Sequence, residues 1–221
     1  MNIPNSIIID FECMGTRSSS IVLDLSAVVF REDQVDSFDK LIKDTKRLFH
    51  VKFDVKSQVK TRTVDSVTLD WWNKQNDDVR SVLNPSIEDK TIEEGIELFS
   101  QFCELNDIDP KNSLAYSRGT SYDFPILADI VSSVKKEVEP GMWPCAFWNQ
   151  RDVRSAIAYA MLQPHLRKLP VVKDTFLGFV KHNSIHDVCK DAILLQTALA
   201  YGRGDLEMPD IVFDGSVDMI G

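Results

Sequence analysis

The sequence predicts an α/β fold in which a mixed β-sheet is flanked by α-helices. Residues 6–46 contain short apolar runs rich in Val and Ile and separated by polar turns, which favours three antiparallel strands. From residue 64 onward, segments with helical periodicity alternate with short apolar runs. Strands that first meander and then alternate with helices are typical of a mixed sheet covered by helices.

The three N-terminal strands are expected at residues 6–12, 20–31 and 38–46. In the segment 64–83, Trp72, Val79 and Val82 recur at helical spacing, so we expect one helix with Trp72 in the core. Residues 91–107 are predicted as the next helix, because Thr91 and Glu94 form a capping-box pattern at its start.

The C-terminal half continues the alternation of strands and helices. We expect a strand at 113–119, a helix from Asp123 to Lys136, a strand at 144–150, a helix at 152–162 and a final helix from Ser184 to Tyr201. Residues 1–205 are predicted as a single domain. The acidic tail, 206–221, either packs back through its apolar residues Ile211, Val212 and Phe213 or frays.

The composition, 43% hydrophobic and 27% charged residues among 221, is that of a soluble globular protein. No apolar run is long enough to cross a bilayer and no signal-peptide pattern is present, so we expect a cytoplasmic protein. Four widely spaced cysteines favour reduced thiols over disulfides or a zinc site. The net charge of −9 argues against broad non-specific binding to nucleic acid, but it leaves room for a local site where divalent cations supply positive charge. A basic segment between Lys40 and Arg62 is either a solvated face or a patch that steers phosphate.

Two acids interrupt the first apolar strand, "SIIIDFEC". Asp10 and Glu12 lie two residues apart and therefore share one face of the strand, with Cα atoms roughly 6.6 Å apart. Burying such charges costs several kcal/mol unless they are paired or bind a metal. The strand therefore either ends in water or carries two carboxylates that converge on one or two cations.

Further acids occur at two distant places. Asp123 follows the strand 113–119, where it is either an N-cap or a member of a site. In "HNSIHDVCKDAILL", Ser184 and Asp187 fit a capping box. Asp191 has no such explanation, since it lies inside an apolar helix, and His186 stands five residues before it.

The ordered set Asp10-x-Glu12, Tyr122-Asp123 and His186-x4-Asp191-Ala192 resembles the DEDDh branch of the DnaQ-like (RNase H-like) 3′→5′ exonucleases. The stretches "IIDFECMG", "WW" and "FWNQRDVRSA" narrow the resemblance to the phage exonuclease A group and the short RNase T-like 3′ exoribonucleases. It covers residues 6–201. One departure concerns the segment before Asp123, where many members have an Asn and this chain has Arg118, Gly119 and Thr120.

The resemblance implies an RNase H-like sheet and hydrolysis of the 3′-terminal phosphodiester of a nucleic acid, with release of nucleoside 5′-monophosphates. It further implies that two Mg²⁺ or Mn²⁺ ions are held by the carboxylates Asp10, Glu12, Asp123 and Asp191. In this scheme His186 is the general base, since an imidazole titrates near about 6.5 and hard oxygen ligands suit these cations.

The same resemblance places the terminal nucleotide against the backbone of residues 11 and 13–15, which are Phe11, Cys13, Met14 and Gly15. Trp71 is the candidate platform for base stacking, because Trp72 faces the core. Single-stranded DNA is the expected substrate. An exoribonuclease, a catalytically inactive nucleic-acid-binding module and a plain structural domain are the alternatives, and the last requires basic partners for Asp10 and Asp191. Related short exoribonucleases are often dimers, so a homodimer is an open option.

Overall fold

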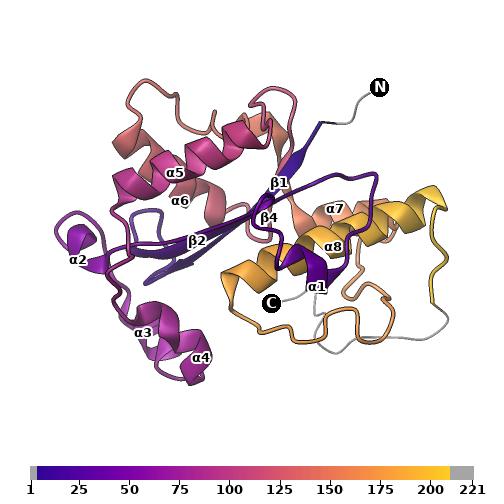
Figure 1. Cartoon of the computed structure of the whole chain (residues 1–221), viewed down its shortest axis with the longest axis horizontal. Coiled ribbons are helices and arrows are strands. Elements are labelled where there is room, and N and C mark those ends of the chain that lie inside the picture. The colour runs from indigo at the N-terminus through magenta and orange to yellow at the C-terminus, as the bar shows by residue number, and fades with distance from the viewer. Residues whose placement is uncertain (1–3, 210–221) are drawn as a thin grey trace.

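The computed structural model describes residues 4–209, and the apolar residues expected to anchor the tail, 211–213, lie outside them. Within residues 4–209 the chain forms a five-stranded sheet with the order β3-β2-β1-β4-β5 (Figure 1). Its strands are β1 (Ser6–Cys13), β2 (Val22–Phe30), β3 (Leu48–Lys52), β4 (Ala115–Ser117) and β5 (Gln150–Asp152). The first three strands pair antiparallel, whereas β4 and β5 run parallel to β1. The predicted mixed sheet with an antiparallel beginning is confirmed.

Helices cover both faces of this sheet (Figure 1). Ile7 and Ile9 of β1 pack in one core with α5 (Ile92–Leu105) and α6 (Asp123–Val134). Ile8 points the other way and packs in a second core with α1 (Phe38–Leu41), α7 (Val153–Ala160) and α8 (Ser184–Arg203). Because side chains alternate along a strand, Asp10 and Glu12 lie on the same face as Ile8, toward α8.

The predicted third strand, 38–46, is wrong. Phe38 and Leu41 are both buried, and this i,i+3 spacing belongs to the short helix α1. A turn follows, in which the Asp44 carboxylate accepts hydrogen bonds from Arg47, and the strand begins only at Leu48. The apolar residues at positions 38 and 41 therefore mark one turn of helix and not a strand.

The helix predicted over 64–83 is present as three pieces, α3 (Ser66–Trp72), α4 (Asp77–Arg80) and the 3₁₀-helix η1 (Ser81–Leu83). The break falls at Asn76, whose side chain accepts a hydrogen bond from Val79 N and caps α4. Asn commonly starts a helix in this way because its side chain competes with the backbone. Trp72 is buried as expected, and a further short helix, α2 (Val55–Gln58), precedes this region.

The strand predicted at 144–150 is also displaced. Residues 147–149 form the 3₁₀-helix η2 (Phe147–Asn149), and β5 starts at Gln150. The other predicted helices are confirmed to within a few residues, including the reciprocal capping box of Thr91 and Glu94 at the start of α5.

None of the helices in residues 4–209 combines the length and apolar character that a bilayer-spanning segment needs. All four cysteines are buried and unpaired, as expected for reduced thiols. Part of the basic segment holds structure together, since Arg47 pairs with Asp36 and Asp44 and Arg62 pairs with Asp129. The steering of phosphate by its remaining lysines stays a prediction.

Candidate active site

The predicted acids gather at one edge of the sheet, where β1 and β4 end. These strands are parallel neighbours, so their carboxyl ends lie at the same edge. Asp10 and Glu12 occupy the last residues of β1, and Arg118 directly follows β4. The helix α8 begins over the same edge with Asp187 in its first turn.

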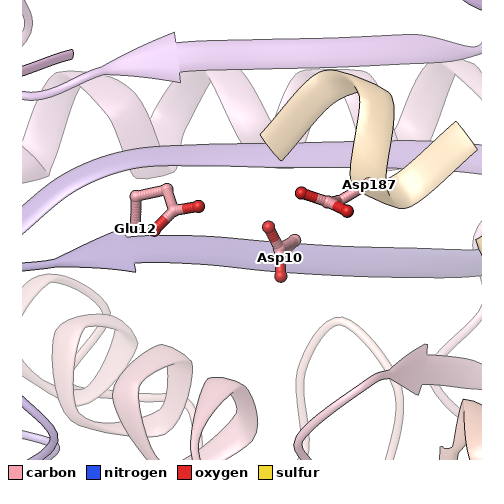
Figure 2. A group of neighbouring side chains, drawn as sticks. All are labelled: Asp10, Glu12 and Asp187. Carbon is pink, nitrogen blue, oxygen red and sulfur yellow. The ribbon is translucent and has the colours of Figure 1, made fainter. Parts of the chain in front are cut away.

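Three carboxylates form a compact cluster. Asp10, Glu12 and Asp187 each offer a ligand oxygen, and these oxygens lie within 4.8 Å of one another. Figure 2 shows the first two on β1 and Asp187 on α8, with the carboxylates pointing toward one another. All three side chains are half-buried, so the cluster is reachable from solvent. This arrangement fits a divalent cation with oxygen ligands.

Asp123 borders this cluster from the other face of the sheet. It is the first residue of α6, with Tyr122 rather than itself at the N-cap, and its side chain is almost completely buried. Its Oδ1 accepts a hydrogen bond from Phe11 N at 3.2 Å, on β1 between Asp10 and Glu12. The Asp123 carboxylate thus binds a backbone N–H of β1 at a position past the last residue pair between β1 and β4.

Burial raises the pKa of three acids of the site, Asp10, Glu12 and Asp123. The pKa of Asp10 lies well above its ordinary value because of burial and then the nearby Asp123, and burial likewise raises the pKa of Glu12, assisted by Asp24. Burial raises the pKa of Asp123 to about 7. Carboxylates that resist ionisation together are stabilised in the charged form by a bound cation, which again fits a metal site.

We expect the metal-free protein to lose stability as pH rises from 5 to 7.5. Between the ordinary pKa of an Asp, 3.8, and the folded-state value of about 7, the unfolded chain has released the Asp123 proton while the folded chain retains it. Folding then requires proton uptake, so a rise in pH favours unfolding. Melting temperatures measured in EDTA across this range are expected to fall, and the fall is expected to be shallower in Asp123→Asn. An equal slope in both proteins would contradict this origin.

Asp187 is not part of a capping box with Ser184. The N-cap of α8 is Asn183, whose side chain accepts a hydrogen bond from His186 N. The Asp187 carboxylate instead accepts from His182 N at 2.9 Å and from Lys190 Nζ at 2.8 Å. These two donors hold the carboxylate toward β1, and each oxygen retains a lone pair for a cation.

Asp191 lies one helical turn further along α8 and has a different partner. Its carboxylate accepts hydrogen bonds from Arg118, with Nε 3.0 Å from Oδ2 and 3.1 Å from Oδ1, and Nη2 also contacts Oδ1. The basic partner required by the plain structural reading is therefore present for Asp191. Its role as a metal ligand stays a prediction, and the geometry favours Asp187 in that place.

His186 packs away from the carboxylates. Its ring lies edge-on to Phe38 with centroids 5.5 Å apart, and Nδ1 accepts a hydrogen bond from Val180 N at 3.0 Å. The role of His186 as the general base stays a prediction. The other histidine at the same spacing from an acid, His182, precedes Asp187 by five residues and donates its backbone N–H to that acid.

The ring of His182 is held beside the cluster. It contacts Trp71 edge-on, with centroids 4.9 Å apart, and burial lowers the pKa of His182 below its ordinary value of 6.5. His182 and Glu12 line a common hollow of about 250 Å³. A neutral imidazole facing such a hollow next to carboxylates is equipped to accept a proton.

The comparisons with known proteins agree with this geometry. Residues 5–199 match the family described as the 3′–5′ exoribonuclease Rv2179c-like domain. The chain belongs to this family. It is also 37% identical over 212 residues to an exodeoxyribonuclease of Enterobacteria phage T4, covering 91% of this chain and 92% of the relative. The chain is a 3′–5′ exonuclease acting on nucleic acid, and the predicted kinship with DnaQ-like exonucleases is confirmed.

Solved structures show that this Rv2179c-like exonuclease has the expected RNase H-like fold. Cell-death related nuclease 4 (CRN-4) superposes with a TM-score of 0.58 at 14% identity, over 90% of this chain and 65% of that one. The zinc-bound complex of E. coli ExoI with single-stranded DNA superposes with a TM-score of 0.56 at 10% identity, over 92% of this chain and 42% of that one. The chain thus spans less than half of the length of ExoI.

The residues predicted to contact the terminal nucleotide surround the end of β1. Their backbone groups already have protein partners: Phe11 N donates to Asp123, Cys13 O accepts from Trp72, Met14 pairs with Ile21 and Asp65, and Gly15 O accepts from Tyr122. Trp71 packs on Trp72 and His182 rather than standing open to a base. Their contacts to substrate stay predictions of the family resemblance.

A buried polar network behind Glu12 was missed at the sequence level. Asp24 lies opposite Glu12 on β2, and its Oδ2 accepts from Ser184 Oγ at 3.0 Å and lies 3.2 Å from His50 Nε2. Ser184 Oγ is also 2.8 Å from Ser26 Oγ, which fastens the start of α8 to β2. The sequence does mark Asp24, because it is an acid inside the apolar stretch "IVLDLSAVV". Asp10 stands out in the first strand for the same reason.

Proposed function

We propose that this exonuclease removes nucleotides one at a time from the 3′ end of single-stranded DNA and releases nucleoside 5′-monophosphates. The proposal rests on the cluster of Asp10, Glu12 and Asp187, whose oxygens lie within 4.8 Å of one another. DNA is favoured by the 37% identity to an exodeoxyribonuclease over almost the whole chain. RNA is the second candidate, because the matching family is described by exoribonuclease activity.

Two Mg²⁺ or Mn²⁺ ions are proposed as cofactors, held by Asp10, Glu12, Asp123 and Asp187. All four side chains offer hard oxygen ligands, which these cations prefer. When bound, such ions neutralise the negative charge that gathers on the phosphate oxygens and make a water molecule easier to deprotonate. Asp187 replaces Asp191 in this assignment because it lies with Asp10 and Glu12, whereas Asp191 is paired with Arg118.

His182 is proposed as the general base in place of His186. Burial lowers the pKa of His182, so its ring is neutral and ready to accept a proton at neutral pH. Trp71 fixes the ring from one side, and the backbone of His182 is tied to Asp187. The base would therefore take a proton from the attacking water while its own position is set by a cluster carboxylate.

The test uses two oligonucleotides of the same sequence, one DNA and one RNA, each labelled at the 5′ end and incubated with Mg²⁺. We expect a ladder that shortens from the 3′ end, mononucleotide products bearing a 5′-phosphate, and faster shortening of DNA. EDTA is expected to stop the reaction. Faster digestion of RNA would select the second candidate, and cleavage at internal positions would contradict removal from the end.

A further inference from the structure

Arg118 occupies the edge of the sheet where the acid cluster lies. It is the first residue after β4, and its side chain is about one-fifth exposed, 18%, whereas that of Asp191 is 4% exposed. The guanidinium is thus paired with a buried carboxylate of α8 and keeps a small exposed fraction. Arg154 donates a hydrogen bond to the Arg118 carbonyl, which also anchors its backbone.

The Arg118–Asp191 pair is more than a tie between β4 and α8. A buried ion pair is seldom a net source of stability, since desolvation of both charges offsets their attraction. Burial lowers the pKa of Arg118, but Asp191, and to a smaller extent Asp187 and Asp10, outweigh it and raise the pKa above its ordinary value. Asp191 itself lies one helical turn from Asp187 of the acid cluster, so the guanidinium stands next to that cluster. The pair thus sets a fixed positive charge beside the carboxylates that converge on one point.

A substrate of this site brings a phosphodiester, and the lining of the site is strongly acidic. Negative phosphate oxygens are repelled by carboxylates unless positive charge faces them. Bound cations supply part of that charge, and a planar guanidinium supplies paired N–H donors matched to phosphate oxygens. The Asp191 carboxylate accepts hydrogen bonds from Nε and Nη2 of Arg118 and so fixes the plane of the guanidinium before the substrate binds.

We propose that Arg118 binds the phosphate of the terminal nucleotide and that Asp191 is the positioning residue that orients it. This inference rests on the proposed function, because it concerns the substrate of the same site. It gives Asp191, the buried acid of α8 that lies outside the compact cluster, a task in the reaction. Arg118 then contributes to recognition of any chain that ends in a 3′-terminal phosphodiester.

The test measures binding without turnover. Deoxyadenosine 5′-monophosphate and deoxyadenosine are titrated calorimetrically into the protein in the presence of Ca²⁺. For Arg118→Met we expect the dissociation constant of the monophosphate to rise about 10- to 100-fold, as for the loss of a charge-assisted hydrogen bond. Binding of the nucleoside is expected to stay unchanged. Arg118→Lys is expected to fall between the two, because it keeps the charge and loses the fork.

Two further variants separate recognition from folding. Arg118→Met leaves Asp191 buried without its partner, so the double variant Arg118→Met/Asp191→Asn removes the whole pair and is expected to recover thermal stability without recovering monophosphate binding. Arg31→Met is the matched control, since Arg31 makes a similar fork to Asp33 at the opposite end of the sheet. It is expected to bind like the unmodified protein.

Two results would overturn the inference. One is unchanged monophosphate binding in Arg118→Met, and the other is an equal loss of nucleoside binding, which would show a collapsed site. The proposed function fails separately, if the unmodified protein leaves labelled oligonucleotides intact. Selective loss of phosphate binding in that case would still support Arg118 as a phosphate ligand.

Discussion

Replacing Asp10 by Asn is expected to lower the rate of 3′-terminal hydrolysis by a factor on the order of 10³ or more, while the chain remains folded. Asp10 is central to the cluster, with Glu12 two residues away on the same strand face and Asp187 facing it from α8. Loss of a cation ligand removes several kcal/mol of charge stabilisation in the transition state, and each 1.36 kcal/mol corresponds to about a tenfold change in rate.

The same replacement is expected to raise the melting temperature in EDTA at pH 7.5. Burial raises the pKa of Asp10, and a neutral amide of similar size removes the cost of a charged or protonated acid at that position. Mg²⁺ is then expected to stabilise Asp10→Asn less than the unmodified protein. This combination of lower activity with higher metal-free stability distinguishes a functional acid from a structural one.

Asp33→Asn is the matched control, because Asp33 is a solvent-accessible acid paired with Arg31 far from the cluster. It is expected to change neither hydrolysis nor the effect of Mg²⁺. Hydrolysis by Asp10→Asn at the rate of the unmodified protein would remove the metal site from the proposed function.

The second large effect concerns the histidine. His182→Ala is expected to lower kcat by a factor of about 10² to 10⁴, as is typical for loss of a general base, with little change in the affinity for Mg²⁺. His186→Ala is expected to lower kcat far less and to lower the melting temperature, because its ring packs against Phe38 and Phe179. Rates at saturating substrate and thermal melts of both variants check this pair.

The pH dependence gives an independent readout of the same assignment. Burial lowers the pKa of His182 below 6.5, so kcat of the unmodified protein is expected to fall with acid only below that value. This acidic limb is expected to flatten in His182→Ala and to persist in His186→Ala. The opposite pattern would restore His186 as the base.

The sequence was sufficient to locate the acid cluster, but not to decide whether Asp187 or Asp191 is its member on the last helix. "HNSIHDVCKD" contains two His-x4-Asp pairs offset by four residues, which is about one helical turn, so both acids point to the same side of α8. Spacing alone cannot separate them. The choice depends on Arg118, a residue distant in sequence that lies beside Asp191 only after β4 and α8 meet.

The errors in the fold have a similar origin. The sheet was predictable wherever runs of Ile and Val are buried on both faces, as in β1 and β2. It was not predictable at 38–46, because Phe38 and Leu41 face the core shared with α8 from a four-residue helix, which is too short to show a helical period in the sequence. The basic segment contains two arginines paired with acids, such as Arg47 with Asp36, that only the folded chain brings together.

Asp187 and Asp191 are joined by a single turn of α8, which separates them by about 6 Å along the helix axis. The helix therefore fixes the distance between the Asp187 carboxylate of the acid cluster and the Asp191 carboxylate that pairs with Arg118. Any sliding of α8 along the sheet would displace both carboxylates together, so the proposed cation site and the proposed phosphate contact are expected to change together. The hydrogen bonds of Ser184 with Asp24 and Ser26 fix the start of α8 at one position along β2.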